Sequence, residues 1–104
     1  MNQMTFEILL NPSVPVEDEL RLSRQANKMY GLFRIRHRIG LCVSTIDLEE
    51  IGNQYQARLY EVRRALIPLG WCIDLVRKGQ GGINYYKLVR VEDSKFYAER
   101  KYTL

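Results

Sequence analysis

The sequence predicts one α+β domain, in which three helices precede a β-hairpin. Apolar residues recur every three or four positions as far as Leu66, as they do on the buried faces of helices. The segment after Pro68 and Gly70 is instead rich in the β-branched and aromatic residues of strands. The length of 104 residues fits one domain, which buries roughly two-thirds of its unfolded surface, so a core can form without metals or disulfides. We expect this domain to span residues 17–89, between an N-terminal extension (1–16) and a C-terminal tail (90–104).

The extension contains one apolar run, Met4–Leu10, which is too short for its period to distinguish a strand from a helix. Asn11 and Pro12 end the run. Ser13–Pro15 is expected to form a turn or linker, because each proline favours extended geometry in the residue before it.

The first helix is predicted over Glu17–Ile39. Acidic residues near its start and arginines near its end suit the helix dipole, and Gly40 is well placed to end it. The residues of its buried stripe are Leu22, Ala26, Met29 and Phe33.

A brief β-type run, Leu41–Val43, leads into a short second helix that ends at Gly52. Ser44 and Asp47 have the spacing of a capping box, in which each side chain bonds to the backbone N–H of the other residue. The short strand and this helix therefore follow each other directly.

The third helix is predicted over residues 54–66 and ends before Pro68 and Gly70. Its inward face consists of Tyr55, Leu59, Val62 and Leu66. Its opposite face presents Ala57, Tyr60, Glu61 and Arg64.

Two strand-like segments follow, Trp71–Arg77 and Ile83–Val89. The intervening Lys78–Gly82 contains three glycines and is short enough to form a hairpin loop. The tail alternates charged and aromatic residues, and its pattern predicts no single structure.

The formal net charge of +4 is unevenly distributed along the chain. Residues 1–20 hold four acids and no Lys or Arg, whereas residues 21–40 hold six Lys or Arg and no acid. Such segregation is expected of a nucleic-acid-binding protein, although solvated helices can also be basic. Because side chains two positions apart diverge on a helix, Arg34, Arg36 and Arg38 cannot all face one surface.

Four segments resemble the small helix-turn-helix domain of phage and mobile-element proteins: Val43–Ile51, Tyr55–Arg63, Gly70–Ile73 and Tyr86–Leu88. The resemblance covers roughly residues 23–89. It implies a winged-helix fold and DNA binding, with Ala57, Arg58 and Arg63 in the recognition-helix motif. The sequence departs from the family pattern at Val62, where leucine is usual, and at residues 65–69, which add about a turn.

If the third helix enters the major groove, several of its hydrogen-bond donors lie near DNA. There Arg can bond to guanine and Gln to adenine. Arg64 points most directly away from the core, whereas Arg58 and Arg63 border the buried stripe and are equally suited to bonds within the fold. For Arg58 that alternative is an ion pair with Asp47 or Glu50. The candidate residues on the helix are Gln54, Gln56, Arg58, Tyr60, Arg63 and Arg64, and those on the hairpin are Arg77, Lys78 and Gln80.

Other classes of function find little support in the sequence. His37, the single histidine, has no Ser, Cys or acid placed near it as in a catalytic group, so we expect no enzyme activity. One His and two separated cysteines, Cys42 and Cys72, make no zinc pattern, and the hairpin glycines make no phosphate loop, so no metal or cofactor is predicted. No signal peptide or membrane span is visible, and the two cysteines suggest reduced thiols in a cytoplasmic protein.

The sequence therefore predicts a regulatory or architectural protein that binds double-stranded DNA. The alternative is a winged-helix module for protein interaction or homodimerisation that binds no nucleic acid. Glu49, Glu50 and Glu61 favour this alternative, because acids near the expected DNA face would oppose phosphate. Aromatic residues of the tail would then act as interface anchors: Phe96, Tyr97 and Tyr102.

Overall fold

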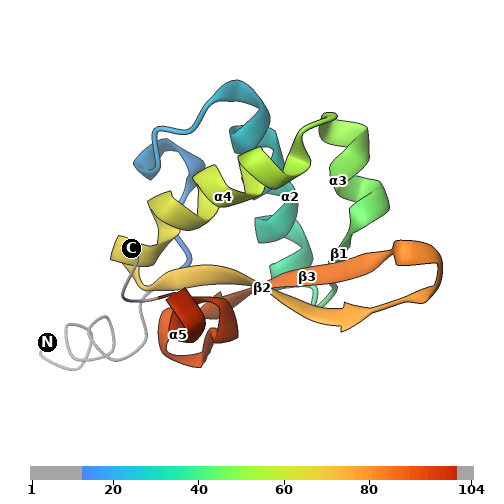
Figure 1. The fold of residues 1–104 in the computed structure, drawn as a ribbon. Coiled ribbons are helices and arrows are strands. Elements are labelled where there is room, and N and C mark those ends of the chain that lie inside the picture. Colours follow the sequence, from blue (N-terminus) through green and yellow to red (C-terminus); the bar gives the residue numbers. More distant parts are fainter. Residues whose placement is uncertain (1–12, 101–104) are drawn as a thin grey trace, which may run out of the picture.

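Three helices lie on one side of a small sheet, and a fourth helix lies against the strand at its edge (Figure 1). This computed structural model describes residues 13–100, with the side chains of residues 13–99. Within that range it contains four α-helices and one three-stranded antiparallel sheet, so the predicted α+β class is confirmed. The expected strand or helix at Met4–Leu10, and Tyr102, lie outside the described residues. The helices and strands are α2 (Arg24–Arg38), β1 (Val43–Ser44), α3 (Thr45–Ile51), α4 (Tyr55–Leu66), β2 (Trp71–Lys78), β3 (Asn84–Arg90) and α5 (Lys95–Arg100); the 3-10 turns are η1 (Glu17–Glu19), η2 (Ile67–Leu69), η3 (Gln80–Gly82) and η4 (Val91–Asp93).

The sheet has the order β1-β3-β2, so the predicted hairpin supplies the two long strands and β1 adds a short third one. Val43 of β1 lies opposite Tyr86, and Ile73 of β2 lies opposite Leu88. The register shifts between Leu75 and Arg77, where the intervening residue has no partner on β3. Such a bulge bends and twists a strand, and here it marks the point where the hairpin leaves the core.

The core lies between the sheet and the three helices, and it contains most of the predicted apolar stripes. Leu22 lies before α2 rather than in it, and Leu22 and Tyr55 are only partly buried against the core. Burying one large apolar side chain contributes about 1.5–3 kcal/mol, so these stripes hold the helices on the sheet. The hydroxyl of the buried Tyr30 donates a hydrogen bond to the Pro15 carbonyl at 2.7 Å, and burial raises the pKa of Tyr30 well above its usual range. The buried core residues include Ala26, Met29, Tyr30 and Phe33 of α2, Leu59, Val62 and Leu66 of α4, and Val43, Ile73, Tyr86 and Leu88 of the sheet.

The first helix is shorter than predicted. The expected helix over Glu17–Ile39 is divided into η1 and α2, and Arg21 between them has a left-handed φ of 52°. The break allows Leu20 to be buried and the Glu17 carboxylate to pair with Arg34. The acidic residues are therefore not in the first turn of α2, and that part of the dipole expectation is wrong.

The end of α2 agrees with the sequence. Arg36, His37 and Arg38 occupy its last turn, where cations are stabilised by the helix dipole. Gly40 has a φ of 75°, and its N–H donates to the His37 carbonyl while the Leu41 N–H donates to the Arg36 carbonyl. This pair of bonds closes the helix as glycine-terminated helices commonly do.

The tail, for which the sequence predicts no structure, continues β3 to Arg90 and then forms η4 and α5. The buried carboxylate of Asp74 on β2 accepts hydrogen bonds from the Ser94 hydroxyl at 2.6 Å and from the Lys95 N–H at 2.7 Å. The Ser94 oxygen in turn accepts a bond from the Tyr97 N–H at 3.0 Å, as at a helix N-cap. Residues 91–99 are therefore attached to the edge strand by a buried polar network.

Among the described residues, no helix is long and apolar enough to cross a membrane. Cys42 and Cys72 are both free thiols, and burial raises the pKa of Cys72. Residues 13–99 contain no group of three or more His, Cys, Asp or Glu side chains that could hold a metal ion.

Candidate nucleic-acid interface

The helix pair α3–α4 is fixed at its start by the predicted capping box. The Ser44 oxygen accepts a bond from the Asp47 N–H at 3.2 Å, and the Asp47 carboxylate accepts one from the Ser44 N–H at 3.0 Å. Arg36 donates from α2 to the same carboxylate at 3.2 Å and to the Cys42 carbonyl at 2.8 Å. Partial burial opposes ionisation of Asp47, but the bonds from Ser44 and Arg36 outweigh it and hold the pKa of Asp47 below its usual value.

The start of α4 presents exposed amide side chains. Gln54 is its N-cap residue, and the side chains of both Gln54 and Gln56 are exposed to solvent. The Gln54 carbonyl accepts the first backbone bonds of the helix, so its position is set by α4 itself. Gln56 donates to the Tyr55 hydroxyl at 3.3 Å, and both groups of this bond are at the surface. Amides at this place can read an adenine edge.

Farther along α4, Tyr60 and Arg64 share the solvent-facing side. Tyr60 is 47% exposed, and the Arg64 guanidinium lies 5.8 Å from the centre of its ring. Ten residues separate Arg64 from Gln54, which is ~15 Å along the helix axis. Arg64 is therefore placed to reach a different part of a ligand from the amides.

Arg58 belongs to a polar network that joins α4 to the start of α2. Its guanidinium donates to Glu61 at 3.1 Å and to the Ser23 hydroxyl at 3.3 Å, and the Ser23 N–H donates to Glu61 at 2.7 Å. The expected partners Asp47 and Glu50 are therefore wrong, because Asp47 is occupied by Arg36 and Glu61 lies closer along the same helix. Arg58 and Glu61 compensate each other's charge.

Arg63 has a structural position on the other flank of α4. Its Nε donates to the Ile73 carbonyl of the edge strand β2 at 2.8 Å, and its guanidinium lies 3.9 Å from the centre of the Phe96 ring. Arg63 thus joins α4, β2 and α5, and we leave it out of the candidate interface. Phe96, expected to be an interface anchor, is half-buried in this contact.

The hairpin loop carries a second group of exposed donors. Arg77, Lys78 and Gln80 are all exposed. The Arg77 guanidinium lies 4.0 Å from the centre of the Tyr85 ring on the opposite strand, which orients it without neutralising it. Gly81 and Gly82 both have positive φ values, 68° and 79°, so the tight loop requires residues without a Cβ at its tip.

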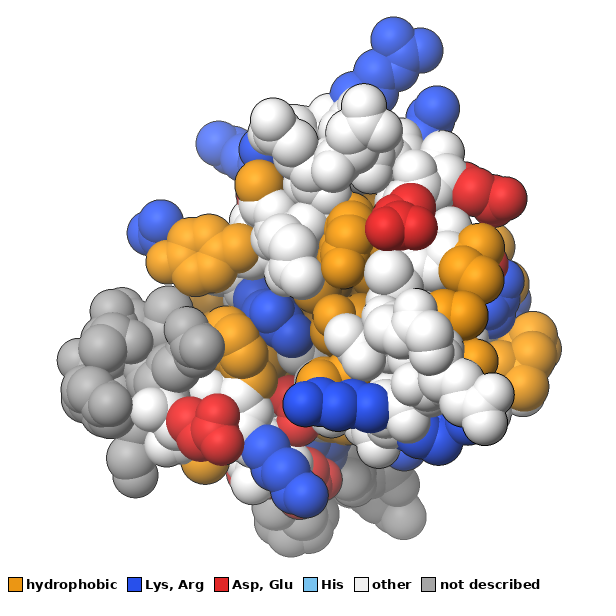
Figure 2. Space-filling model, turned by 45° about the vertical axis from the view of Figure 1, so that its right-hand side comes forward, with side chains coloured by type: hydrophobic (Ala, Val, Ile, Leu, Met, Phe, Trp, Pro, Cys, Tyr) orange, Lys and Arg blue, Asp and Glu red, His pale blue; other side chains and the backbone are white. Residues whose placement is uncertain are grey.

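The base of the hairpin is attached to the start of α3. The Thr45 hydroxyl accepts a bond from the Asn84 N–H at 2.9 Å and lies 3.3 Å from the Asn84 carbonyl, to which it donates. In Figure 1 the hairpin tip, α3 and the start of α4 lie at the same end of the molecule. Figure 2, which brings this end forward, shows Lys and Arg side chains both around the margin and near the middle of the face, with Asp and Glu side chains among them.

The arginines of α2 diverge as expected. Arg34 pairs with Glu17 and Arg36 pairs with Asp47, whereas Arg38 is exposed. Two of the six basic residues in 21–40 are therefore neutralised inside the fold. Glu49 and Glu50 are exposed on α3 and form no ion pair with residues 13–99.

The structure thus divides the candidate residues into exposed donors, one exposed aromatic ring and two arginines that bond within the fold. The exposed donors are Gln54, Gln56 and Arg64 of α4, together with Arg77, Lys78 and Gln80 of the hairpin, and Tyr60 is an exposed ring beside them. Arg58 and Arg63 are engaged within the fold, and their bonds to Ser23 and to the Ile73 carbonyl join segments whose contact the sequence does not show. No protein-family model, curated protein or solved structure matches the chain.

Proposed function

We propose that this chain is a winged-helix protein that binds double-stranded DNA, with α4 as the recognition helix and residues 79–83 as the wing. The order α2, β1, α3, α4 and then a β2–β3 hairpin supports the proposal, and so does the position of β1 beside β3. A helix pair joined by a tight turn can place its second helix in the major groove. The resemblance of Val43–Ile51 and Tyr55–Arg63 to phage and mobile-element proteins suggests a regulatory or architectural role in such a setting.

One observation carries the proposal: the start of α4, with its exposed amides Gln54 and Gln56, and the hairpin, with its exposed donors, lie at the same end of the molecule. Gln54 and Gln56 lie in the first turn of α4, the part of a recognition helix that contacts base edges. Arg77 and Lys78 extend from the hairpin, where cations suit backbone phosphate. Arg64 lies near the far end of α4, so we assign it to phosphate rather than to a base.

Selection from a pool of random DNA duplexes tests this assignment. We expect the wild-type protein to enrich a common site, and Gln56→Ala to lower the preference for it by ~1–3 kcal/mol if a bidentate contact to adenine is lost. Arg64→Ala should weaken binding to all duplexes alike. Lys87→Gln is the matched control, because Lys87 is an exposed cation of β3 that lies opposite Asp74 and is not among the proposed DNA contacts. A wild-type protein that binds no duplex at low salt would refute the proposal.

A specific feature favours a second candidate, the protein-interaction module. The segment Leu20–Leu22 and the solvent-facing side of α4 enclose a hollow of about 610 Å³. Its surface includes the apolar groups of Leu22, Ala57 and Ala65 beside the exposed Tyr60. Apolar surface next to an exposed aromatic ring is common at protein interfaces.

The mass of the protein in solution distinguishes the two candidates. If the hollow mediates homodimerisation, light scattering after size exclusion gives a dimer for the wild type and a monomer for Tyr60→Ala. Deleting the tail is a poor alternative test, because it removes the Ser94 and Lys95 donors from the buried Asp74 carboxylate. A monomer that binds duplex DNA supports the first candidate over this one.

A further inference from the structure

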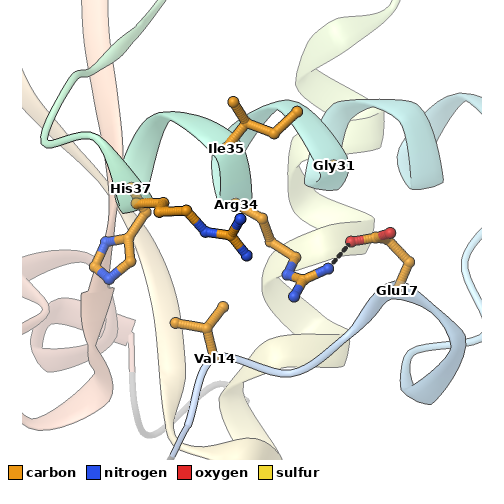
Figure 3. A pocket seen from close by; sticks show the side chains of 7 residues that line it. Val14, Glu17, Gly31, Arg34, Ile35 and His37 are labelled. Carbon is orange, nitrogen blue, oxygen red and sulfur yellow. Dashed lines mark hydrogen bonds and ion pairs between the residues drawn. The ribbon is translucent and has the colours of Figure 1, made fainter.

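A separate cavity of about 350 Å³ lies between the second half of α2 and the segment Val14–Glu17. Val14 and Glu17 line it from the segment, and Gly31, Ile35 and His37 line it from α2 together with Arg34 and Arg38. Figure 3 shows the labelled side chains around this space, with Arg34 extending to Glu17 and His37 at the opposite end.

The cavity lining carries an excess of positive charge. Arg34 bonds to the Glu17 carboxylate, and this bond raises the pKa of Arg34, so the guanidinium stays charged. Arg38 lines the same cavity, is exposed, and has no acidic partner among residues 13–99. Two guanidinium groups therefore share the space with one carboxylate. An anion bound there would compensate the remaining charge.

Gly31 is a second feature of this cavity, and the packing of the helix does not require it. A glycine inside a helix costs roughly 0.5–1 kcal/mol relative to alanine. No atom lies within 4 Å of the position that a Cβ would take at Gly31, so close packing does not require the glycine. The helix dipole explains cations at the end of α2, but it does not explain this glycine, whose missing side chain leaves the cavity floor open.

We infer that this cavity binds a phosphoryl group, with Arg34 and Arg38 as its hydrogen-bond donors and Val14 and Ile35 in contact with the apolar part of the ligand. Guanidinium groups match the geometry of phosphate oxygens and remain charged at all physiological pH values. Ile35 is 62% exposed, which makes it available for such a contact. The site lies outside the proposed DNA-reading surface and does not depend on that proposal.

The ligand can be a small phosphate ester or the phosphate of a nucleic-acid backbone, since both present the same group. Phenyl phosphate is a suitable probe, because it combines that group with an apolar ring. The single tryptophan, Trp71, provides the signal: its ring centre lies 5.5 Å from that of His37, which lines the cavity.

Titration of the full chain with phenyl phosphate, followed by Trp71 fluorescence and by calorimetry, tests the inference. We expect saturable binding by the wild type. Arg38→Gln removes one charge-assisted donor and should lower the affinity by about tenfold or more. Gly31→Leu should block the cavity and abolish binding. Lys28→Gln is the matched control, because Lys28 is an exposed cation of the same helix that does not line the cavity, and its affinity should equal that of the wild type.

Two results would overturn the inference: no saturable binding by the wild type, or equal affinities of Arg38→Gln and Lys28→Gln. Circular dichroism identifies any unfolding of Gly31→Leu. If that variant is unfolded, the comparison of Arg38→Gln with Lys28→Gln tests the inference by itself. A duplex-binding assay with the same pair then identifies the source of the phosphate. With a backbone phosphate as ligand, Arg38→Gln weakens duplex binding more than Lys28→Gln does, and with a free ester the two variants bind duplex equally.

Discussion

The hydroxyl of Thr45 accepts a hydrogen bond from the backbone N–H of Asn84 at 2.9 Å and so joins the first residue of α3 to the first residue of β3. This contact crosses 39 positions of the sequence. Beside the pairing of β1 with β3, it attaches the base of the β2–β3 hairpin to the start of α3. The relative placement of the two groups of donors in the proposed DNA-binding surface therefore depends in part on one side-chain hydroxyl.

Thr45→Val tests that dependence, because valine keeps the shape of threonine and removes the hydroxyl. The Asn84 N–H loses its partner, which is expected to cost about 1–3 kcal/mol of unfolding free energy. Urea denaturation measures the loss. Thr45→Ser retains the hydroxyl and should stay closer to the wild type; equal stability of the valine variant and the wild type would contradict this role of the contact.

Adjacent arginines on α4 should behave differently. Arg63→Ala removes the bond to the Ile73 carbonyl and the contact with Phe96, so we expect it to lose about 1–3 kcal/mol of stability. Arg64→Ala, at an exposed position, should change stability by no more than about 0.5 kcal/mol and should weaken duplex binding instead. Thermal or urea unfolding combined with a duplex titration separates the two effects. A larger loss of stability in Arg64→Ala than in Arg63→Ala would contradict the structural position of Arg63.

Asp47→Asn tests the capping box through its pH dependence. The pKa of Asp47 is lowered in the folded protein, so its ionised form contributes stability above the unfolded pKa of about 3.9. This contribution is lost as the pH falls through the folded pKa. At pH 7 we expect the variant to be less stable by about 1 kcal/mol, and the difference should shrink below about pH 4. A difference that stays constant from pH 7 to strongly acidic solution would show that the charge is not the cause.

Gly31→Ala should stabilise the protein. A Cβ at this position meets no atom within 4 Å, and alanine favours the helix over glycine by about 0.5–1 kcal/mol. A rise in the urea midpoint without a change in the slope would agree with this expectation. A loss of stability would mean that Gly31 serves the packing of α2, and it would remove the support that Gly31 gives to the phosphoryl site.

Local patterns predict much of this fold. The apolar stripes of α2 and α4, the Ser44–Asp47 capping box and the glycine-tipped hairpin all occur as the sequence indicates, because each depends on residues a few positions apart. The period of the first helix, however, does not reveal its break at Arg21. That break depends on the burial of Leu20 and on a pair between Glu17 and Arg34, which are distant in the sequence.

Several contacts that sequence reasoning missed are long-range, although the Arg58–Glu61 pair spans only three positions. Arg58 bonds to Ser23 across 35 positions, and Ser94 bonds to Asp74 across 20. No local pattern in the sequence indicates that Asp74, in the middle of a strand, contacts Ser94, which precedes a short helix. The candidate interface could therefore be proposed from exposed donor types, but the separation of structural arginines from available ones required the tertiary contacts.

The salt dependence of duplex binding tests the central proposal most directly. For a protein that neutralises several phosphates, log K falls linearly with log salt concentration, with a slope of about −0.9 per phosphate contact. We expect this behaviour from the wild type and from Lys87→Gln, whereas the double variant Arg77→Gln/Lys78→Gln should lose about two contacts and show a slope shallower by about 1.8. Binding that does not depend on salt, or equal slopes for the double variant and the control, would contradict the placement of DNA against the hairpin.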